Sequence, residues 1–172
     1  MLMFRRARLD DAPAVVSLVE SSYRGELSRA GWTTEADILD GQRTDIEDVR
    51  SCIEAEHGFI LLGLDEAAIV ACANVTVGGN AGYFGMFSVS PTRQAGGVGK
   101  AMLAEAERIV RDEWHLAAMR MTVIDIREEL IAYYERRGYL RTGIKKPFPY
   151  GDHRFGIPKR DDLRFEVLEK AL

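Results

Sequence analysis

The chain has 172 residues, of which 47% are hydrophobic and 29% charged, and its formal net charge at pH 7 is -4. These values predict one globular domain, residues 1–172, with a hydrophobic core of its own. The acidic balance argues against a nucleic acid partner, because phosphate backbones bind to basic surfaces. No apolar run approaches membrane-spanning length, and the N-terminus becomes charged too soon for a signal peptide. We therefore expect a cytoplasmic protein with no membrane partner.

The two cysteines lie in apolar stretches and lack the spacing of metal ligands. Cys52 and Cys72 are separated by 19 residues, which is not the short spacing of a paired metal-ligand motif. Such residues usually pack as small apolar side chains. The sequence predicts buried, reduced thiols and no metal site.

The N-terminal part begins with a strand and an amphipathic helix. Residues 2–7 form the predicted strand. Asp10 or Asp11 is placed to cap the helix, and Pro13 falls in its first turn, where proline is tolerated. Gly25 is expected to end this helix.

Two further helix starts are indicated by capping-box patterns. Thr34 with Asp37 predicts a short helix that runs to Gly41, and Thr44 with Glu47 predicts another helix. Three helices are therefore expected before the next strand.

The middle of the chain reads as antiparallel strands. Residues 59–64 and 67–77 are rich in β-branched and aromatic residues, and the glycine pair at 78–80 marks a turn before a strand at 82–89. A long helix is expected at 100–113.

The C-terminal third alternates strands with one helix. The helix is predicted at 128–137, with Gly138 as its left-handed stop. Strands are expected at 118–124, 139–144 and 163–168. The whole order, β-α-α-α-β-β-β-α-β-α-β-β, predicts a mixed α+β fold: a twisted mixed sheet of about seven strands with helices on both faces. A strand–loop–helix–strand unit forms its centre.

The glycine-rich loop before residues 100–113 is the most informative segment. The backbone N–H groups of the loop lie next to those at the N-terminus of the following helix. Together with the positive end of the helix dipole, these donors form a binding site for phosphate. A Walker A loop is excluded, because Gln94 stands where the first glycine belongs and Ala101 where serine or threonine holds magnesium. The dinucleotide fingerprint fails at its third glycine, where Met102 is too bulky.

The pattern that fits is Gln94-x-x-Gly97-x-Gly99, preceded by Val89-x-Pro91. It resembles the pyrophosphate-binding motif of the GNAT superfamily of N-acetyltransferases, which bind acetyl-coenzyme A. A second stretch, Tyr134-Glu135-Arg136-Arg137-Gly138-Tyr139, resembles the family's downstream landmark. The element order agrees with a GNAT-like fold over nearly the whole chain, and the resemblance is weakest in the N-terminal acceptor region.

The resemblance implies an acyltransferase with acetyl-coenzyme A as co-substrate, and it implies specific residue roles. Tyr134 takes the position of the general acid that protonates the departing thiolate. Arg93 flanks the loop and is expected to meet phosphate. The coenzyme-binding positions carried over are Phe87, Ser88, Val89, Gln94, Ala95, Gly96, Gly97, Val98, Gly99, Lys100 and Arg127.

Two departures from the family pattern affect these roles. Arg127 stands where relatives often have asparagine, so it is expected to contact the coenzyme, a phosphate or an acceptor carboxylate. Residues 82–86 contain no glutamate to act as base through water. The base stays open among an ordered water, Glu26, Glu35, Asp37 and Asp125, of which Asp125 is also the expected N-cap of the helix after it.

The acceptor region is expected at residues 23–43, with Tyr23, Trp32 and Glu35 as candidate contacts. Its mixture of aromatic, acidic and basic side chains suits a zwitterion or a small polar amine. The long segment 145–162, which holds His153, is either a lid over the acceptor mouth or a packed surface loop.

Three functions follow in order of preference. The first is N-acetylation of a small polar or amino-acid-like primary amine. The second is acetylation of a protein N-terminus or lysine, and the third is a catalytically silent coenzyme-binding module. Dimers are common in proteins of this kind, so a homodimer is left open.

Overall fold

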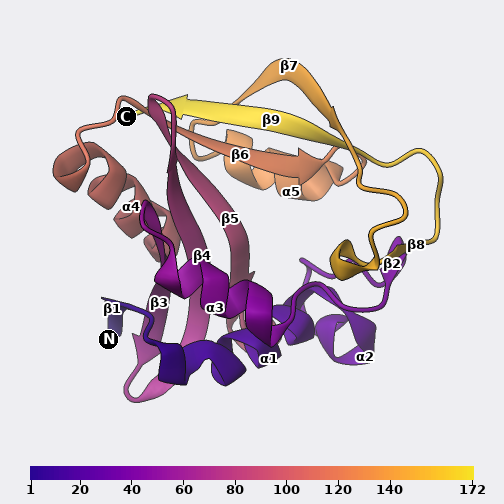
Figure 1. Cartoon of the computed structure of the whole chain (residues 1–172), viewed down its shortest axis with the longest axis horizontal. Coiled ribbons are helices and arrows are strands. Elements are labelled where there is room, and N and C mark those ends of the chain that lie inside the picture. Colours follow the sequence, from indigo (N-terminus) through magenta and orange to yellow (C-terminus); the bar gives the residue numbers. More distant parts are fainter.

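The computed structural model describes residues 1–172, apart from the side chains of Glu26 and Phe155. Glu26, one of the candidate bases, is therefore outside the described side chains. Seven strands form one sheet in the order β1-β3-β4-β5-β6-β9-β7 (Figure 1). They are β1 Leu2–Arg6, β3 Gly58–Asp65, β4 Ala68–Gly78, β5 Ala81–Val89, β6 Ala118–Ile124, β7 Leu140–Pro147 and β9 Arg164–Ala171.

The sheet is mixed, as predicted. Its strands pair antiparallel except for β5 and β6, which are parallel. A separate pair joins β2 (Leu39–Asp40) to β8 (Ile157–Pro158). The parallel pair is connected through the glycine-rich loop and α4 (Val98–Arg108), so the expected strand–loop–helix–strand unit lies at the centre of the sheet.

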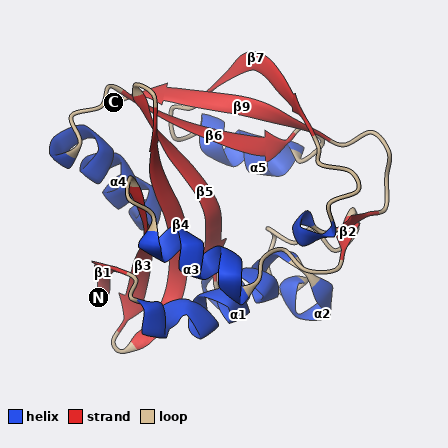
Figure 2. Ribbon diagram, in the orientation of Figure 1, coloured by secondary structure: helices blue, strands red, loops and turns tan.

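Helices cover both faces of the sheet because its strands are apolar on both faces. In β3, Phe59 and Leu61 pack in the core cluster that contains α4 and α5 (Glu128–Glu135), whereas Ile60 and Leu62 pack in the cluster with α1 (Ala12–Tyr23) and α3 (Ile46–Glu54). Alternate side chains of a strand point to opposite faces. Figure 2 shows α3 in front of β3 and β4, and α5 behind β6 and β9.

The predicted helix from Thr34 to Gly41 is wrong. The helix between α1 and α3 is α2, Gly25–Ser28, and residues 34–41 form a turn that leads into β2. The Thr34 hydroxyl accepts a hydrogen bond from the Ala36 N–H at 3.1 Å. This bond, two residues along the chain, stabilises a tight turn and does not cap a helix. Pairing of β2 with β8 then holds the chain extended, and a contact distant in sequence overrides the local pattern.

Of the three cap predictions, one is confirmed in position and two are wrong. Asp11 stands at the N-cap of α1 as predicted, and its carboxylate binds the Arg5 guanidinium at 2.7 Å rather than an amide of the helix. The cap of α3 is Asp45, which accepts from the Asp48 N–H, and not Thr44. Arg127, not Asp125, is the N-cap of α5.

The C-terminal end of α5 follows the prediction. Gly138 has a φ of +96°, and its N–H donates to the Glu135 carbonyl. This left-handed conformation is cheap for glycine and ends the helix. The next residue, Tyr139, is fully buried and donates from its hydroxyl to Glu107 at 2.9 Å.

The strands β5 and β6 separate, and this separation positions the site. They pair only at Gly82 with Met119 and at Tyr83 with Arg120, and beyond this point they diverge (Figure 1). A β-bulge accompanies the divergence: Met86 has a φ of +51°, and the β4–β5 register shifts between Cys72 and Asn74. Bulges bend a strand and re-aim its side chains.

Within the part of the chain that the structure describes, no helix has the length and apolar character needed to cross a membrane.

Candidate active site

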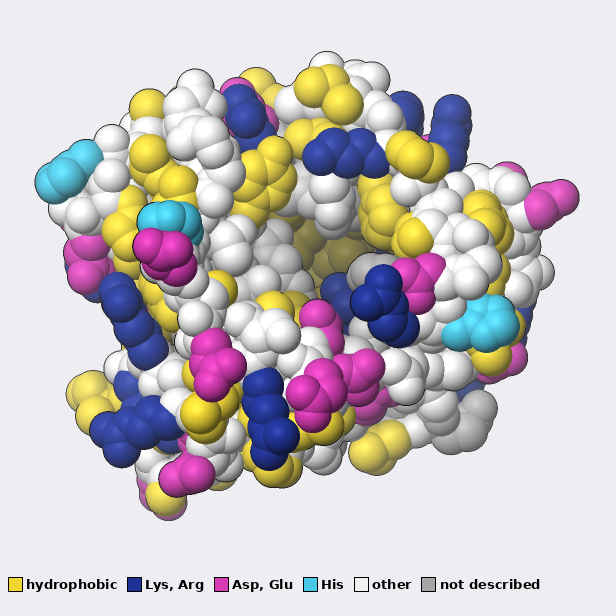
Figure 3. Space-filling view, in the orientation of Figure 1, with side chains coloured by type: hydrophobic (Ala, Val, Ile, Leu, Met, Phe, Trp, Pro, Cys, Tyr) yellow, Lys and Arg dark blue, Asp and Glu magenta, His cyan; other side chains and the backbone are white. Residues whose placement is uncertain are grey.

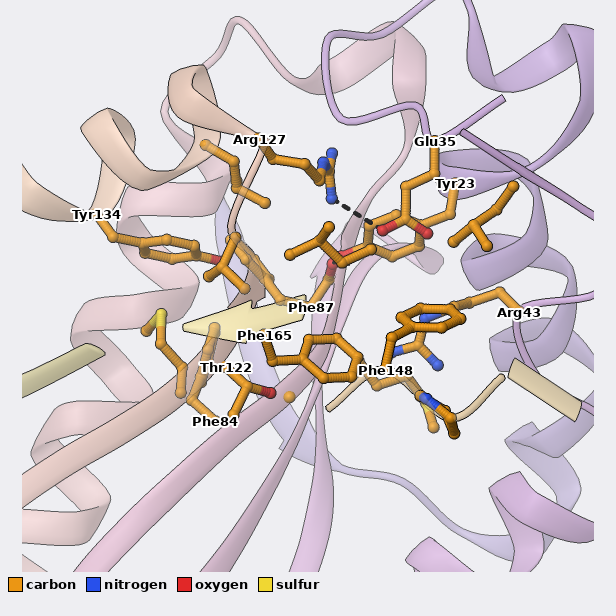
Figure 4. Close-up of a pocket in the computed structure, with 18 of the residues that line it drawn as sticks. Tyr23, Glu35, Arg43, Phe84, Phe87, Thr122, Arg127, Tyr134, Phe148 and Phe165 are labelled. Carbon is orange, nitrogen blue, oxygen red and sulfur yellow. Dashed lines mark hydrogen bonds and ion pairs between the residues drawn. The ribbon is translucent and has the colours of Figure 1, made fainter. Parts of the chain in front are cut away.

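A cavity lies where β5 and β6 separate. Its volume is about 390 Å³, and it is lined from β5, β6, α1, α5 and the segment after β7. Figure 3 shows a hollow near the centre of this face, with hydrophobic side chains at its base. Three phenylalanines, Phe84, Phe148 and Phe165, contribute to the apolar part of the lining. In Figure 4 the rings of Phe148 and Phe165 lie opposite the side chains of Glu35 and Arg127.

A buried charged cluster forms the other wall of this larger cavity. Glu35 is 6% exposed, and its two carboxylate oxygens accept from two guanidinium groups, Oε1 from Arg24 and Oε2 from Arg127 at 3.1 Å. Arg127 also donates to the Thr33 carbonyl. Buried charges persist only when they are paired and hydrogen-bonded, so this network is a fixed part of the site.

The backbone of β5 at the fork is partnered by side chains from other elements. The Tyr23 hydroxyl donates to the Phe87 carbonyl, and the Val89 carbonyl accepts from Ser22 Oγ at 3.1 Å and Gln94 Nε2 at 3.0 Å. Carbonyl oxygens buried without a partner are costly, and β6 is too far away here to pair with them. These side chains replace the missing strand.

A second, smaller cavity lies on the side of the fork that faces the glycine-rich loop. It measures about 30 Å³ and is lined by Trp32, Tyr133 and Gly99 among others. The rings of Trp32 and Tyr133 pack with their centroids 5.1 Å apart. The backbone N–H of Trp32 donates a hydrogen bond to Gln94 Oε1 at 2.9 Å. These side chains leave room for little more than water.

Tyr134 lines both cavities. It is 4% exposed, and its ring packs against Tyr139 and Tyr133 with centroids 5.9 and 5.4 Å away. Burial, and then the nearby phenols of Tyr23 and Tyr133, hold the pKa of Tyr134 well above its ordinary value. Its hydroxyl therefore keeps its proton at neutral pH.

The glycine-rich loop has the shape that a diphosphate requires. Gly97 is the N-cap of α4 and has a φ of +77°, and a Cβ built there would meet nothing within 4 Å. Gly96 and Gly97 are exposed. The first-turn amides of α4 have no carbonyl partner within the helix. Open space in front of these donors and of the positive end of the helix dipole fits a pyrophosphate.

We expect Gly97→Val to weaken binding of coenzyme A by at least tenfold in calorimetry. The branched side chain would enter the open space in front of the α4 amides and would also strain the left-handed backbone. The matched control is Gly79→Val in the β4–β5 turn, where φ is +63° and the space is equally open. It carries the same backbone strain far from the loop and should bind coenzyme normally. Equal losses in both variants would contradict the diphosphate seat.

The remaining predicted site residues fall in several places. Ser88 is buried and donates to the Met86 carbonyl at 3.3 Å, so its side chain lines neither cavity. Arg93 forms an ion pair with Asp65. Trp32, expected at the acceptor, lies at the smaller cavity with 40% exposure. The other loop positions are exposed at Ala95 and Lys100 and buried at Val98.

The candidate bases are also separated. Asp37 is exposed and pairs with Arg29 at 2.9 Å, and Asp125 pairs with Lys145 and Arg164. Among the described side chains that line the larger cavity, Glu35 is the only carboxylate. The structure thus brings together Tyr23, Glu35, Arg127 and Tyr134.

Several cavity residues were not among the candidate contacts from the sequence, although Arg43 lies in the acceptor region expected at residues 23–43. Phe84 and Phe165 lie on strands, where their spacing indicates burial but not which strands will part. Phe148 comes from the segment 145–162, and Arg43 follows β2. The pairing of β2 with β8 brings Phe148 and Arg43 to the same cavity. No local sequence pattern predicts this pairing. Among the described residues, no group of three or more histidine, cysteine and acidic side chains could hold a metal ion.

Solved structures with the same fold are numerous. The ribosomal-protein-S18-alanine N-acetyltransferase of Escherichia coli is 15% identical, with a TM-score of 0.72 over 99% of this chain and 94% of that one. A ribosomal-protein-alanine N-acetyltransferase from Brucella melitensis is 18% identical, with a TM-score of 0.73 over 99% of both chains. The PaiA N-acetyltransferase from Thermoplasma acidophilum, in complex with coenzyme A, is 14% identical, with a TM-score of 0.66 over 100% and 99%.

At these identities the likeness shows a shared fold. No curated protein is significantly similar to the chain. The sequence itself matches the family model described as Acetyltransferase (GNAT) family over residues 15–139, which is more than half of its length. The match includes α1, the forked strands, the glycine-rich loop and Tyr134. The chain therefore belongs to the GNAT family of acetyltransferases, whose acetyl donor is acetyl-coenzyme A.

Proposed function

We propose that this protein transfers the acetyl group of acetyl-coenzyme A to the primary amine of a small acceptor, by direct attack of the amine on the thioester. The observation that carries the proposal is the position of Tyr134. It stands at the fork of β5 and β6 and lines both the smaller cavity, next to the glycine-rich loop, and the larger cavity with its charged wall. A donor that approaches from one side and an acceptor from the other would meet beside its hydroxyl.

On the donor side, the amides after Arg93 bind the diphosphate and the backbone at Phe87 and Val89 faces the pantetheine arm. Because the Val89 carbonyl is bonded to Gln94, a pantetheine amide takes the place of the Gln94 side chain there. Backbone N–H groups near the bulge at Met86 then stabilise the oxyanion. One such donor contributes roughly 3 kcal/mol to catalysis.

The chemical step needs a neutral amine and a proton for the sulfur. Arg127 and Arg43 lie in the cavity wall, and their positive charge disfavours an ammonium group beside them. Glu35 is bound by two guanidinium groups, so the amine gives up its proton to water. The amine nitrogen bonds to the carbonyl carbon, the tetrahedral oxyanion collapses, the C–S bond breaks, and Tyr134 donates its proton to the departing thiolate. The surplus proton on the nitrogen passes to water, and water returns a proton to the Tyr134 oxygen, so the amide, the free thiol and the neutral phenol remain.

The enclosure of the larger cavity favours a small acceptor over a protein segment. Phe148 and Pro149, which follow β7, form part of its wall, and β8 ties the same segment to β2. The segment 145–162 thus acts as a lid, and the cavity of about 390 Å³ falls near the lower end of the range for small-molecule sites.

The test is release of coenzyme A thiol from acetyl-coenzyme A across amino acids, polyamines, aminoglycosides and short peptides. The protein's own thiols will contribute little signal, because burial raises the pKa of Cys52 to about 11 and of Cys72 to about 12. We expect turnover with at least one small amine and none with peptides. Tight coenzyme binding without turnover on any amine would instead identify a silent coenzyme-binding module.

A further inference from the structure

The larger cavity carries positive charge in an acidic protein. Its charged lining consists of three guanidinium groups and one carboxylate: Arg24, Arg43, Arg127 and Glu35. The chain as a whole has a net charge of -4. Glu35 neutralises one of the three cations, and the cavity wall keeps an excess of positive charge. An excess of this kind in a recessed site favours an anionic group on the ligand.

Arg43 is the cation that remains without an anion. Its guanidinium has no hydrogen bond or ion pair with any residue that the structure describes, whereas Arg24 and Arg127 are bound to Glu35. Its backbone is fixed, because the N–H groups of Arg43 and Thr44 donate to Glu20 Oε1 at 2.6 and 2.8 Å. The side chain is half-buried over Tyr23, with its guanidinium carbon 5.7 Å from the ring centroid.

The second cation flanks the same ring. The guanidinium carbon of Arg127 lies 5.9 Å from the Tyr23 centroid. Arg43 and Arg127 therefore both lie near the Tyr23 ring, which lines the same cavity. A carboxylate has the flat, two-oxygen geometry that a guanidinium binds through two hydrogen bonds.

The opposite wall is apolar. Phe148 and Phe165 pack with ring centroids 5.6 Å apart, and Phe84 and Met121 extend this surface toward the fork. Figure 4 shows the three phenylalanine rings on the side of the cavity away from Glu35 and Arg127. An aromatic or large aliphatic side chain gains free energy by leaving water for such a surface.

Three features thus surround one space: Tyr134 at the fork, cations near Tyr23, and phenylalanines opposite. An α-amino acid carries an amine, a carboxylate and a side chain on a single carbon. The amine would lie beside Tyr134, the carboxylate beside the cations and the side chain against the phenylalanines. We propose that the acceptor is an α-amino acid with a large apolar side chain, whose carboxylate binds Arg43 beside Arg127 and whose side chain packs on Phe84, Phe148 and Phe165. This inference rests on the proposed function, because it places the α-amine beside Tyr134.

The first experiment compares acceptors that differ in one group. L-Phenylalanine, phenethylamine, which lacks the carboxylate, and L-serine, which lacks the ring, are assayed for kcat/KM. We expect phenylalanine to exceed phenethylamine by about 10²-fold, because the loss of one partner of a buried charge pair is costly. It should exceed serine by at least tenfold. Equal values for phenylalanine and phenethylamine would overturn the proposal.

The second experiment changes the protein. Arg43→Met should lower kcat/KM for phenylalanine by about 10²-fold and kcat/KM for phenethylamine by far less, and Arg43→Lys should recover part of the loss for phenylalanine. Arg50→Met is the matched control, since Arg50 is exposed on α3 and pairs only with Glu47 at 3.6 Å among the described residues. Arg50→Met should leave kcat/KM unchanged for both acceptors. Equal loss for both acceptors in Arg43→Met would contradict a carboxylate contact.

A binding measurement separates this inference from the proposed function. N-acetyl-L-phenylalanine keeps the ring and the carboxylate but cannot be acetylated again at its nitrogen. Titrated into the protein with coenzyme A present, it should bind the wild type and bind Arg43→Met at least tenfold more weakly. If no amine is acetylated but this binding is seen, the proposed function fails and the anion site stands. Absence of binding, or binding that does not depend on Arg43, overturns the site.

Discussion

Replacement of Tyr134 by phenylalanine should lower kcat by about 10²-fold while leaving the affinity for coenzyme A within twofold. The phenol is the proposed proton donor to the leaving thiolate, and loss of a general acid costs a factor of this size or more. Such a loss corresponds to about 2.7 kcal/mol of transition-state stabilisation. The ring contacts with Tyr139 and Tyr133 are retained in the variant, so the fold is expected to survive.

The pH profile sharpens this expectation. Because burial holds the pKa of Tyr134 well above its ordinary value, the acid form persists through the alkaline range. In the wild type below pH 10, kcat should not fall through ionisation of Tyr134. A fall in that range that disappears in Tyr134→Phe would show that the phenol ionises more easily than its surroundings imply.

The control for Tyr134→Phe is Tyr139→Phe. Tyr139 is equally buried, but its hydroxyl donates to Glu107 on α4 rather than facing a cavity. We expect Tyr139→Phe to lower the free energy of unfolding by about 1.5–3 kcal/mol, the usual worth of a hydrogen bond to a charged group, with kcat unchanged. An unchanged rate in Tyr134→Phe would remove this tyrosine from the mechanism.

Replacement of Glu35 by glutamine should lower the free energy of unfolding by about 3–5 kcal/mol in urea denaturation. The change leaves two buried guanidinium groups, those of Arg24 and Arg127, without the carboxylate that binds both. Breaking a buried pair by removal of one partner is strongly destabilising, because the remaining charge stays desolvated. Here one carboxylate serves two cations, so the upper part of the range is expected.

Asp37→Asn provides the comparison. Asp37 lies two residues away in the same turn, and its pair with Arg29 is exposed at the surface, with 79% of the Asp37 side chain accessible. Pairs of this kind contribute about 0.2–1 kcal/mol. If Glu35→Gln costs no more than Asp37→Asn, water reaches the charged cluster and the cluster is not the fixed wall described above.

The sheet and its helices could be predicted because their causes are local. Runs rich in β-branched and aromatic residues indicate β3, β4 and β5, and the left-handed Gly138 ends α5. The helix predicted at residues 34–41 was wrong because the conformation of this segment is set by pairing with β8, more than a hundred residues away in sequence. The cap of α3 differs for a local reason, because Asp45, one residue beyond the threonine that the pattern favoured, accepts the hydrogen bond from the Asp48 N–H.

The site divides in the same way. Tyr134 and the glycine-rich loop could be proposed from the sequence because each occupies one short stretch that resembles a family motif. The acceptor wall could not, since Arg43, Phe84 and Phe148 come from three parts of the chain and meet only after the sheet opens. A sequence shows which residues are apolar or charged, but not which of them will share a cavity.

The packing of Trp32 on Tyr133 has a practical consequence. The chain has two tryptophans, and the other, Trp114, packs edge-on against Phe59 at the opposite end of α4. If the pantetheine arm binds as proposed, the indole of Trp32 leaves its contact with the phenol ring, whereas Trp114 keeps its surroundings. The intrinsic tryptophan fluorescence of the unlabelled protein is therefore expected to change when coenzyme A is added.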